Sequence, residues 1–74
     1  MPQPVYWCGH IGEKDDFGRP LANVMIDGRT QAGPWAIMNP TSWKREGGTN
    51  GRLGLGYGQR FEKQEDGKWL KVEG

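Results

Sequence analysis

Cys8 and His10 are the two side chains of this sequence best suited to metal binding or nucleophilic chemistry. A closed structural zinc site needs four nitrogen or sulfur ligands, and the chain has no other cysteine or histidine. Only Asp15, Asp16 or a second chain could complete such a set. A Cys-His catalytic pair also needs a third group that orients the base. We therefore expect a half-buried cysteine beside a surface histidine, with no catalytic residue and no metal or other cofactor held by one chain.

Two further patterns resemble functional motifs but lack the surroundings that those motifs require. The stretch Gly54-Leu55-Gly56-Tyr57-Gly58 is glycine-rich, yet a Walker A loop continues into Lys-Ser/Thr and a dinucleotide site needs a strand-turn-helix unit. The glycines instead predict a close turn that lets backbone approach Tyr57 or a neighbouring tryptophan. Asp15 and Asp16 are adjacent, and adjacent side chains of an extended segment face opposite sides. We expect both carboxylates in a solvated loop, without paired acid-base chemistry.

The second half of the sequence interleaves basic and aromatic residues. Basic groups beside aromatic rings can bind single-stranded nucleic acid, because they combine phosphate attraction with base stacking. Acidic residues lie among the same positions, which favours a charged hairpin face over an aromatic core. The candidate binding residues in this region are Trp43, Lys44, Arg45, Arg52, Tyr57 and Arg60.

Length and composition limit what these residues can build. A chain of 74 residues forms one domain, 1–74, and a domain of this size buries only about 60% of the surface of its unfolded chain. Its single cysteine excludes an intramolecular disulfide, which favours the cytoplasm. Ten Lys and Arg against nine Asp and Glu give a net charge of +1, far from the strong basicity typical of nucleic-acid coating.

The N-terminal sequence has neither the basic nor the apolar region of a signal peptide. No apolar run reaches the roughly 20 residues that span a bilayer. We therefore expect no export and no membrane association.

Turn residues divide the chain into short segments and predict a β-rich fold. Thirteen glycines and five prolines leave no long window of helical periodicity. We expect a strand over 21–26, a type I′ hairpin turn at Asp27-Gly28 and a strand leaving it over 29–32. Gly33-Pro34 should end that strand, and a further short one is predicted over 35–38.

The sequence after residue 38 predicts one helical turn and a C-terminal hairpin. Asn39 suits an N-cap, Pro40 suits the first helical position, and Gly47 or Gly48 suits the end of a helix over 40–46. A glycine loop should follow over 47–58. The alternation on both sides of Asp66-Gly67 predicts strands over 59–64 and 68–72. The poorly patterned stretch 9–20 is expected to be an exposed loop.

Four tryptophans are spread along the chain, namely Trp7, Trp35, Trp43 and Trp69. Their distribution predicts one shared aromatic core, since each buried ring removes on the order of 150–250 Å² from water. Trp35 should be among the most buried residues, because the Gly33-Pro34 turn and Ala36 allow close packing around it. An exposed Trp35 would instead indicate an interface anchor.

The pairs Val5-x-x-Cys8 and Asn39-x-x-Ser42 repeat the internal spacing of the two C-x-x-C knuckles of a zinc ribbon. Around them, Asp27-Gly28, Thr30, the run Gly33 to Ala36, Met38 and the run Gly54 to Gln59 resemble a group of small zinc-ribbon-like proteins of bacterial and phage genomes. The pattern of that group is C-x-x-C, then DG-x-T-x-x-GPWA-x-MC-x-x-C, then GLG-x-G-x-GQ-x-Y.

The resemblance implies a fold and a genomic setting, but no activity. It places Val5, Cys8, Asn39 and Ser42 at former metal-ligand positions, with three of the four cysteines replaced. The four side chains are then expected to converge on one small volume, where aromatic packing has replaced the metal.

These observations predict a small β-rich, metal-free, zinc-ribbon-like domain with one short helical turn and a C-terminal β-hairpin. The expected function is a non-enzymatic binding module, a phage or mobile-element accessory protein that docks on a host or phage protein. The alternative is a single-stranded nucleic-acid binder that uses the basic and aromatic C-terminal half.

Overall fold

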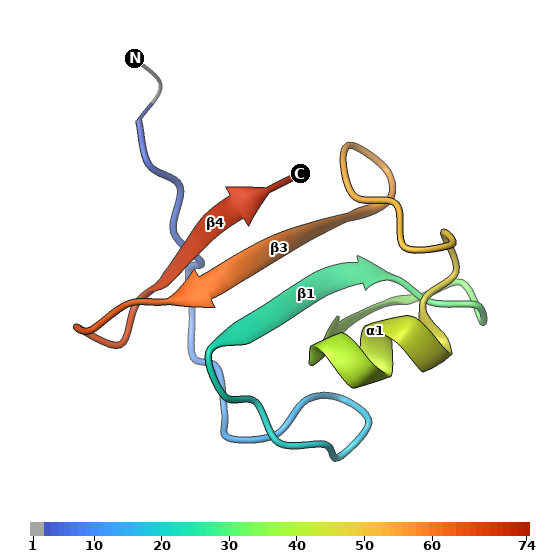
Figure 1. The fold of residues 1–74 in the computed structure, drawn as a ribbon, viewed down its shortest axis with the longest axis horizontal. Coiled ribbons are helices and arrows are strands. Elements are labelled where there is room, and N and C mark those ends of the chain that lie inside the picture. Colours follow the sequence, from blue (N-terminus) through green and yellow to red (C-terminus); the bar gives the residue numbers. More distant parts are fainter. Residues whose placement is uncertain (1–2) are drawn as a thin grey trace.

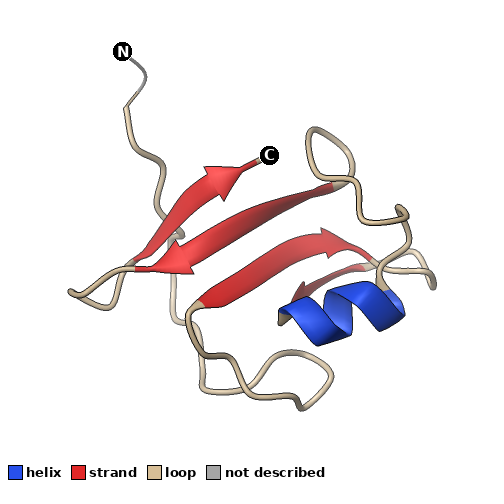
Figure 2. Cartoon of the chain, in the orientation of Figure 1, coloured by secondary structure: helices blue, strands red, loops and turns tan. Residues whose placement is uncertain are grey.

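A four-stranded antiparallel sheet with one short helix forms the protein, as a computed structural model that describes residues 3–74 shows (Figures 1 and 2). The elements follow in the order β1 (Val24–Arg29), β2 (Trp35–Met38), α1 (Pro40–Glu46), β3 (Gly58–Lys63) and β4 (Trp69–Glu73). The strands lie in the order β2-β1-β3-β4, so β2 and β4 are the edge strands. The predicted small β-rich fold is confirmed.

Helix α1 begins and ends where its capping residues predict. The Asn39 side chain accepts a hydrogen bond of 2.7 Å from the Ser42 N–H, and Pro40 occupies the first turn. At the other end, the Gly47 N–H donates to the carbonyl of Trp43 at 2.9 Å. The predicted range 40–46 is confirmed. The sequence could predict it because each of these capping signals is local to the helix.

The C-terminal hairpin also has the predicted position. Its strands β3 and β4 both begin and end within one residue of the bounds predicted for them. The Lys68 N–H donates to the Asp66 carboxylate at 2.9 Å, and Gly67 has φ 85°. Glycine takes this left-handed conformation without steric cost, so the Asp66-Gly67 turn forms as its sequence indicates.

The predicted turn at Asp27-Gly28 is wrong, because both residues lie inside β1. Gly28 pairs with Ala36 of β2, and its missing side chain leaves room for the Trp43 ring. A Cβ atom added to Gly28 would lie 2.6 Å from that ring. The chain reverses later, where the Thr30 N–H bonds the Pro34 carbonyl at 3.1 Å. The strand predicted over 35–38 is confirmed as β2.

Residues 5–20, the N-terminal segment, cover one face of the sheet and contact both of its edges. With α1 in front, the segment runs behind β4 and β3 (blue in Figure 1). At the β4 edge, the Trp7 N–H donates to the Trp69 carbonyl at 2.9 Å. At the β2 edge, the Asp16 N–H donates to the Ile37 carbonyl at 2.9 Å, and the Asp16 carboxylate accepts the Ile37 N–H at 2.7 Å. Unpaired edge strands are sites of aggregation, and this segment covers part of each.

The hydrophobic core lies between the sheet and the N-terminal segment. Met25, Phe61 and Trp69 are its buried members, and partly buried Trp7, Ile11, Leu21 and Ile37 pack against them. The rings of Trp7 and Phe61 meet edge to face, with centroids 5.6 Å apart. A core built by a segment without strand or helix pattern is not visible in the sequence.

The four tryptophans do not share this core, contrary to the expectation from their spacing. Trp7 and Trp69 belong to it, whereas Trp43 packs on the opposite face, against Gly28. Trp35 is 44% exposed, so its predicted deep burial is wrong. The reason is its position at the start of the edge strand β2. Trp7 and Ile11 pack against Met25 and Phe61, farther along the sheet, and do not cover Trp35.

Candidate functional site

Two side chains of adjacent strands and one from the turn before β3 form a row at one end of the sheet, and we call Arg29, Trp35 and Tyr57 the Trp35 cluster. Arg29 of β1 stands directly opposite Trp35 of β2, and opposed residues of antiparallel strands point their side chains to the same face. The Arg29 N–H donates to the Tyr57 carbonyl at 3.0 Å, so the row continues at the residue just before β3. The Arg29 guanidinium carbon lies 5.8 Å from the centre of the Tyr57 ring.

The aromatic side chains of the Trp35 cluster are open to solvent. Trp35 is 44% exposed and Tyr57 is 37% exposed. Beside Tyr57, Leu55 is fully exposed at the tip of a turn in which the Tyr57 N–H donates to the Gly54 carbonyl at 2.9 Å. The glycine stretch 54–58 therefore forms a close turn at Tyr57, as predicted. A large side chain exposed beside other apolar groups marks a contact surface more strongly than an isolated one.

Acidic groups border the Trp35 cluster on the same face of the sheet. Asp27 lies two residues before Arg29 on β1, and its carboxylate accepts a hydrogen bond of 3.4 Å from Gln59. Burial raises the pKa of the Asp27 carboxyl, the bond from Gln59 opposes this, and the nearby charge of Asp16 raises it further. The one cation of the Trp35 cluster, Arg29, therefore has carboxylates nearby, outside the cluster itself.

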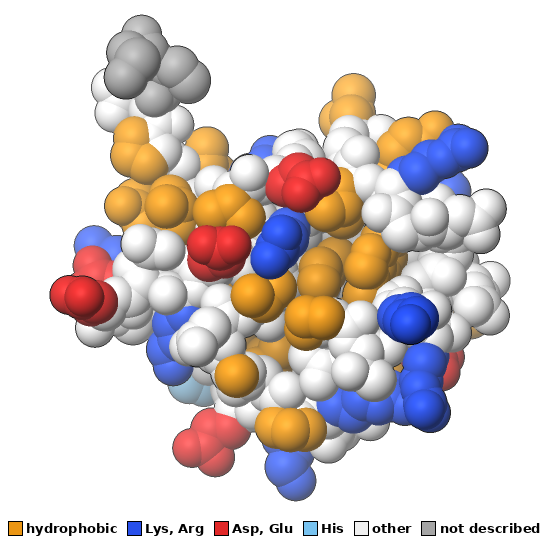
Figure 3. All heavy atoms as spheres, viewed as in Figure 1, with side chains coloured by type: hydrophobic (Ala, Val, Ile, Leu, Met, Phe, Trp, Pro, Cys, Tyr) orange, Lys and Arg blue, Asp and Glu red, His pale blue; other side chains and the backbone are white. Residues whose placement is uncertain are grey.

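The candidate binding residues from the second half of the sequence are distributed over both faces. Trp43 is half-buried against the backbone of Gly28 and Gly47. Lys44 and Arg45 are exposed on α1. On the face that carries α1, basic side chains are interspersed with acidic and apolar ones (Figure 3).

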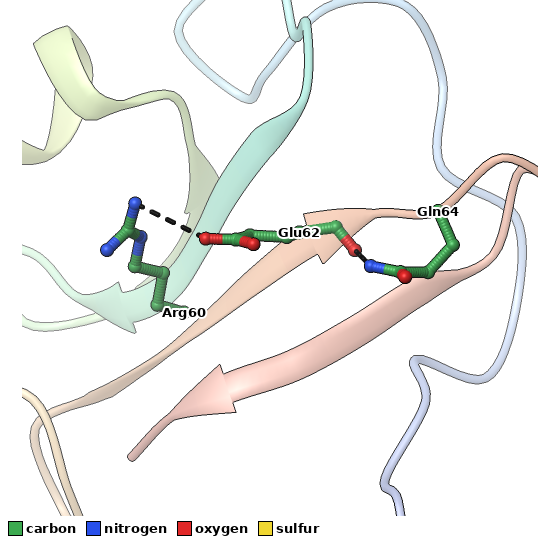
Figure 4. A network of polar contacts seen from close by, with 3 residues as sticks. All are labelled: Arg60, Glu62 and Gln64. Atoms are coloured by element: carbon green, nitrogen blue, oxygen red, sulfur yellow. Dashed lines mark hydrogen bonds and ion pairs between the residues drawn. The ribbon is translucent and has the colours of Figure 1, made fainter.

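The other candidates are separated as well. Arg52 is exposed in the loop after α1. Arg60 pairs with Ile26 of β1 and points to the face of α1. Its guanidinium lies 3.6 Å from the Glu62 carboxylate, and the backbone carbonyl of Glu62 accepts a hydrogen bond from the Gln64 side chain (Figure 4). Tyr57 lies with Arg29 at the other face, so the structure does not gather the candidates into one basic patch.

The former ligand positions of the zinc-ribbon pattern lie at opposite edges of the sheet. The Val5 carbonyl accepts the Lys71 N–H of β4 at 2.7 Å, whereas Asn39 directly follows β2. Three strand spacings of about 4.8 Å each separate these edges. Cys8 is exposed and Ser42 is buried, so the expected convergence of the four side chains is not observed. Within residues 3–74, no group of three or more His, Cys, Asp or Glu side chains is placed to hold a metal ion.

Asp15 anchors a buried polar network that the sequence did not reveal. The expectation of a solvated Asp15 is wrong, because the residue is only 6% exposed. Its carboxylate accepts the backbone N–H groups of Phe17, Arg19 and Asn39 at 3.0, 2.8 and 2.9 Å. It also accepts the hydroxyl of Ser42.

These hydrogen bonds decide the ionisation of Asp15. Burial by itself raises the pKa of the carboxyl, but the bonds from Ser42, Asn39, Arg19 and Phe17 outweigh it and hold the pKa below its usual value. Arg19 completes the network by donating to the Ser42 Oγ at 3.0 Å.

This network joins the N-terminal segment to the start of α1. Ser42 is fully buried, so a substrate cannot reach its hydroxyl and the group is not arranged as a nucleophile. One local sequence signal was available. Asp15 is followed three residues later by Gly18, which has φ 79°, and this arrangement is typical of a turn in which the aspartate carboxylate accepts the following backbone N–H groups.

Comparison of the chain with family models, with curated proteins and with solved structures finds no match. In the described part of the chain, no helix has the length and apolar character needed to cross a membrane.

Proposed function

We propose that this protein is a non-enzymatic binding module that docks on another protein through the Trp35 cluster. The observation that carries the proposal is the exposure of Trp35 in a row with Arg29 and Tyr57. The resemblance to phage and bacterial proteins adds the proposed setting, a phage or mobile-element accessory protein with a host or phage protein as its partner.

The composition of the Trp35 cluster supports a protein partner. Tryptophan, tyrosine and arginine are the residue types enriched among the side chains that contribute most to protein interfaces. Leaving nearly half of a tryptophan exposed forgoes roughly 2–3 kcal/mol of hydrophobic stabilisation, at about 25 cal/mol per Å². A partner that covers Trp35 would recover this free energy in the complex.

A single-stranded nucleic acid is the second candidate partner. Exposed rings beside an arginine can stack on bases, which gives this alternative a structural basis in Trp35 and Tyr57. Asp16 and Asp27 oppose it, because both carboxylates would repel a phosphate backbone at this end of the sheet.

Affinity capture from a host lysate tests the proposal when the parent is compared with two variants. Trp35→Ala should lose the partner, whereas Tyr6→Ala should retain it. Tyr6 is a matched control because its ring is 43% exposed at the opposite edge of the sheet, where it pairs with Leu70 of β4.

Salt dependence separates the two classes of partner. Retention of a protein that changes little with salt is the expected result. Contacts to phosphates weaken steeply with salt because they release counterions. Capture of a nucleic acid that high salt elutes, or a protein partner bound equally by Trp35→Ala, would contradict the proposal.

A further inference from the structure

Arg29 holds a positive charge that no carboxylate of the described chain neutralises. Among residues 3–74, the one ion pair joins Arg60 to Glu62 at 3.6 Å. Arg19, another half-buried arginine, donates to the hydroxyl of Ser42 at 3.0 Å. The Arg29 guanidinium, in contrast, has the Tyr57 ring as its neighbour at 5.8 Å.

The nearest acidic residue on the same face does not pair with Arg29. Asp27 precedes it by two residues on β1, so both side chains point to one side of the sheet. Asp27 is engaged by Gln59 instead, and the pKa of its carboxyl is raised rather than lowered, as expected without an adjacent cation. Arg29 therefore forms no ion pair with the acidic residue that lies two positions away on its own strand.

The surroundings of Arg29 also restrict its motion. Its backbone is held inside the sheet between β2 and β3. Its side chain is half-buried, with Trp35 opposite and Tyr57 against the guanidinium. A guanidinium presents its donors as a fixed planar fork that matches a carboxylate, and a side chain already held in place loses less conformational freedom when it binds.

We propose that Arg29 receives a single carboxylate of the partner protein, while Trp35 and Tyr57 pack against the apolar atoms around that carboxylate. This inference rests on the proposed docking function and names the chemistry that the docking site recognises. The carboxylate belongs to an acidic side chain or to a chain terminus, since both present the same two oxygen atoms. Asp27 and Asp16 both lie at the Ile37 position, on one side of the Arg29 and Trp35 pair, and a single cation beside them suits one carboxylate and disfavours a run of phosphates.

A random peptide library with free C-termini, selected on the immobilised parent protein, tests this inference. Peptides whose binding requires Trp35 should carry an acidic residue at a fixed position or end in a required free carboxylate. Synthetic versions then distinguish the two sources of the carboxylate. Conversion of Asp or Glu to its amide abolishes binding through an acidic side chain, and C-terminal amidation abolishes binding through a chain terminus.

Variants of Arg29 make the test quantitative. Arg29→Gln should weaken the selected peptides by about ten- to hundredfold, the effect of losing a hydrogen-bonded charge. Arg29→Lys should weaken them less, because it keeps the charge without the fork. Arg45→Gln is the matched control, since Arg45 is exposed on α1 at the opposite face, and it should bind as the parent does. Melting temperatures near that of the parent establish that each variant is folded.

The outcomes separate this inference from the function on which it rests. Peptides that require Trp35 but bind Arg29→Gln normally and share no carboxylate overturn the inference and leave the docking function intact. A failure to select any peptide that depends on Trp35 counts against both. Salt-sensitive binding of oligothymidylate that is lost in Arg29→Gln would assign the cluster to nucleic acid and overturn both proposals.

Discussion

At the scale of single residues, Asp15 makes stability depend on pH in a defined direction. Hydrogen bonds hold its pKa in the folded protein below the usual value of 3.8. A carboxyl whose pKa is lowered by folding stabilises the protein above its unfolded pKa, and this contribution is lost as pH falls through the folded pKa. We therefore expect the stabilisation by Asp15 to be fully present and independent of pH near neutrality, and to decrease below about pH 4, the unfolded value.

Replacement of this carboxylate isolates its contribution. Asp15→Asn should lower the free energy of unfolding by about 1.5–3 kcal/mol at neutral pH, because an amide nitrogen would face backbone donors. The deficit relative to the parent should shrink in acid. Asp27→Asn is the control, since burial raises the pKa of that carboxyl and its charge opposes folding at neutral pH. Urea denaturation across the pH range measures both; an equal loss for the two variants would contradict this assignment.

At the scale of elements, the contact between α1 and the sheet depends on the absence of a side chain at Gly28. A Cβ atom there would lie 2.6 Å from the Trp43 ring and 3.3 Å from Ile26. Gly28→Ala should therefore destabilise the protein by about 1–3 kcal/mol through overpacking. Addition of Trp43→Phe should recover part of the lost stability, because the smaller ring leaves room for the new methyl group and the effects of substitutions at two residues in contact are not additive.

Thermal denaturation of the two single variants and the double variant measures this coupling. Gly12→Ala is the matched control, because a Cβ atom there would meet nothing within 4 Å, and it should leave the melting temperature nearly unchanged. Full additivity of Gly28→Ala and Trp43→Phe would show that the ring does not limit what position 28 can hold.

The same contact explains which elements the sequence could predict. Helix α1 and the Asp66-Gly67 hairpin depend on capping and turn residues within a few positions of one another, and both lie where local chemistry places them. Asp27-Gly28 is an equally strong local turn signal, yet it is overridden by a tryptophan from another element. Turn propensity describes the backbone alone, and it contains no information about a ring that must fit above the glycine.

At the scale of the whole molecule, several features that the sequence did not predict depend on the path of the N-terminal segment. This segment has no periodic pattern, yet it supplies Trp7 to the core, buries Asp15 beside Ser42 and contacts both edge strands. Its route also leaves Trp35 uncovered at one end of the sheet. The exposure of Trp35 and the burial of Asp15 were therefore both predicted wrongly for one reason, namely that neither depends on neighbours in sequence.

Loss of the Trp7 ring should consequently destabilise the whole domain rather than its N-terminus alone. The ring packs against Phe61 at 5.6 Å, and its backbone N–H joins the segment to β4. Trp7→Ala should lower the free energy of unfolding by about 2–4 kcal/mol, somewhat less than for a fully buried tryptophan. Tyr6→Ala, which removes a more exposed ring from the adjacent position, should cost much less.

Amide hydrogen exchange of the two variants locates the effect. A domain that unfolds as one cooperative unit should lose protection in Trp7→Ala throughout β1, β3 and β4, because its core is shared by the sheet and the segment. Loss of protection confined to residues 5–8 would mean that the sheet is stable without the N-terminal segment. In that case α1, packed through Trp43 on the other face, would be sufficient to hold the four strands together.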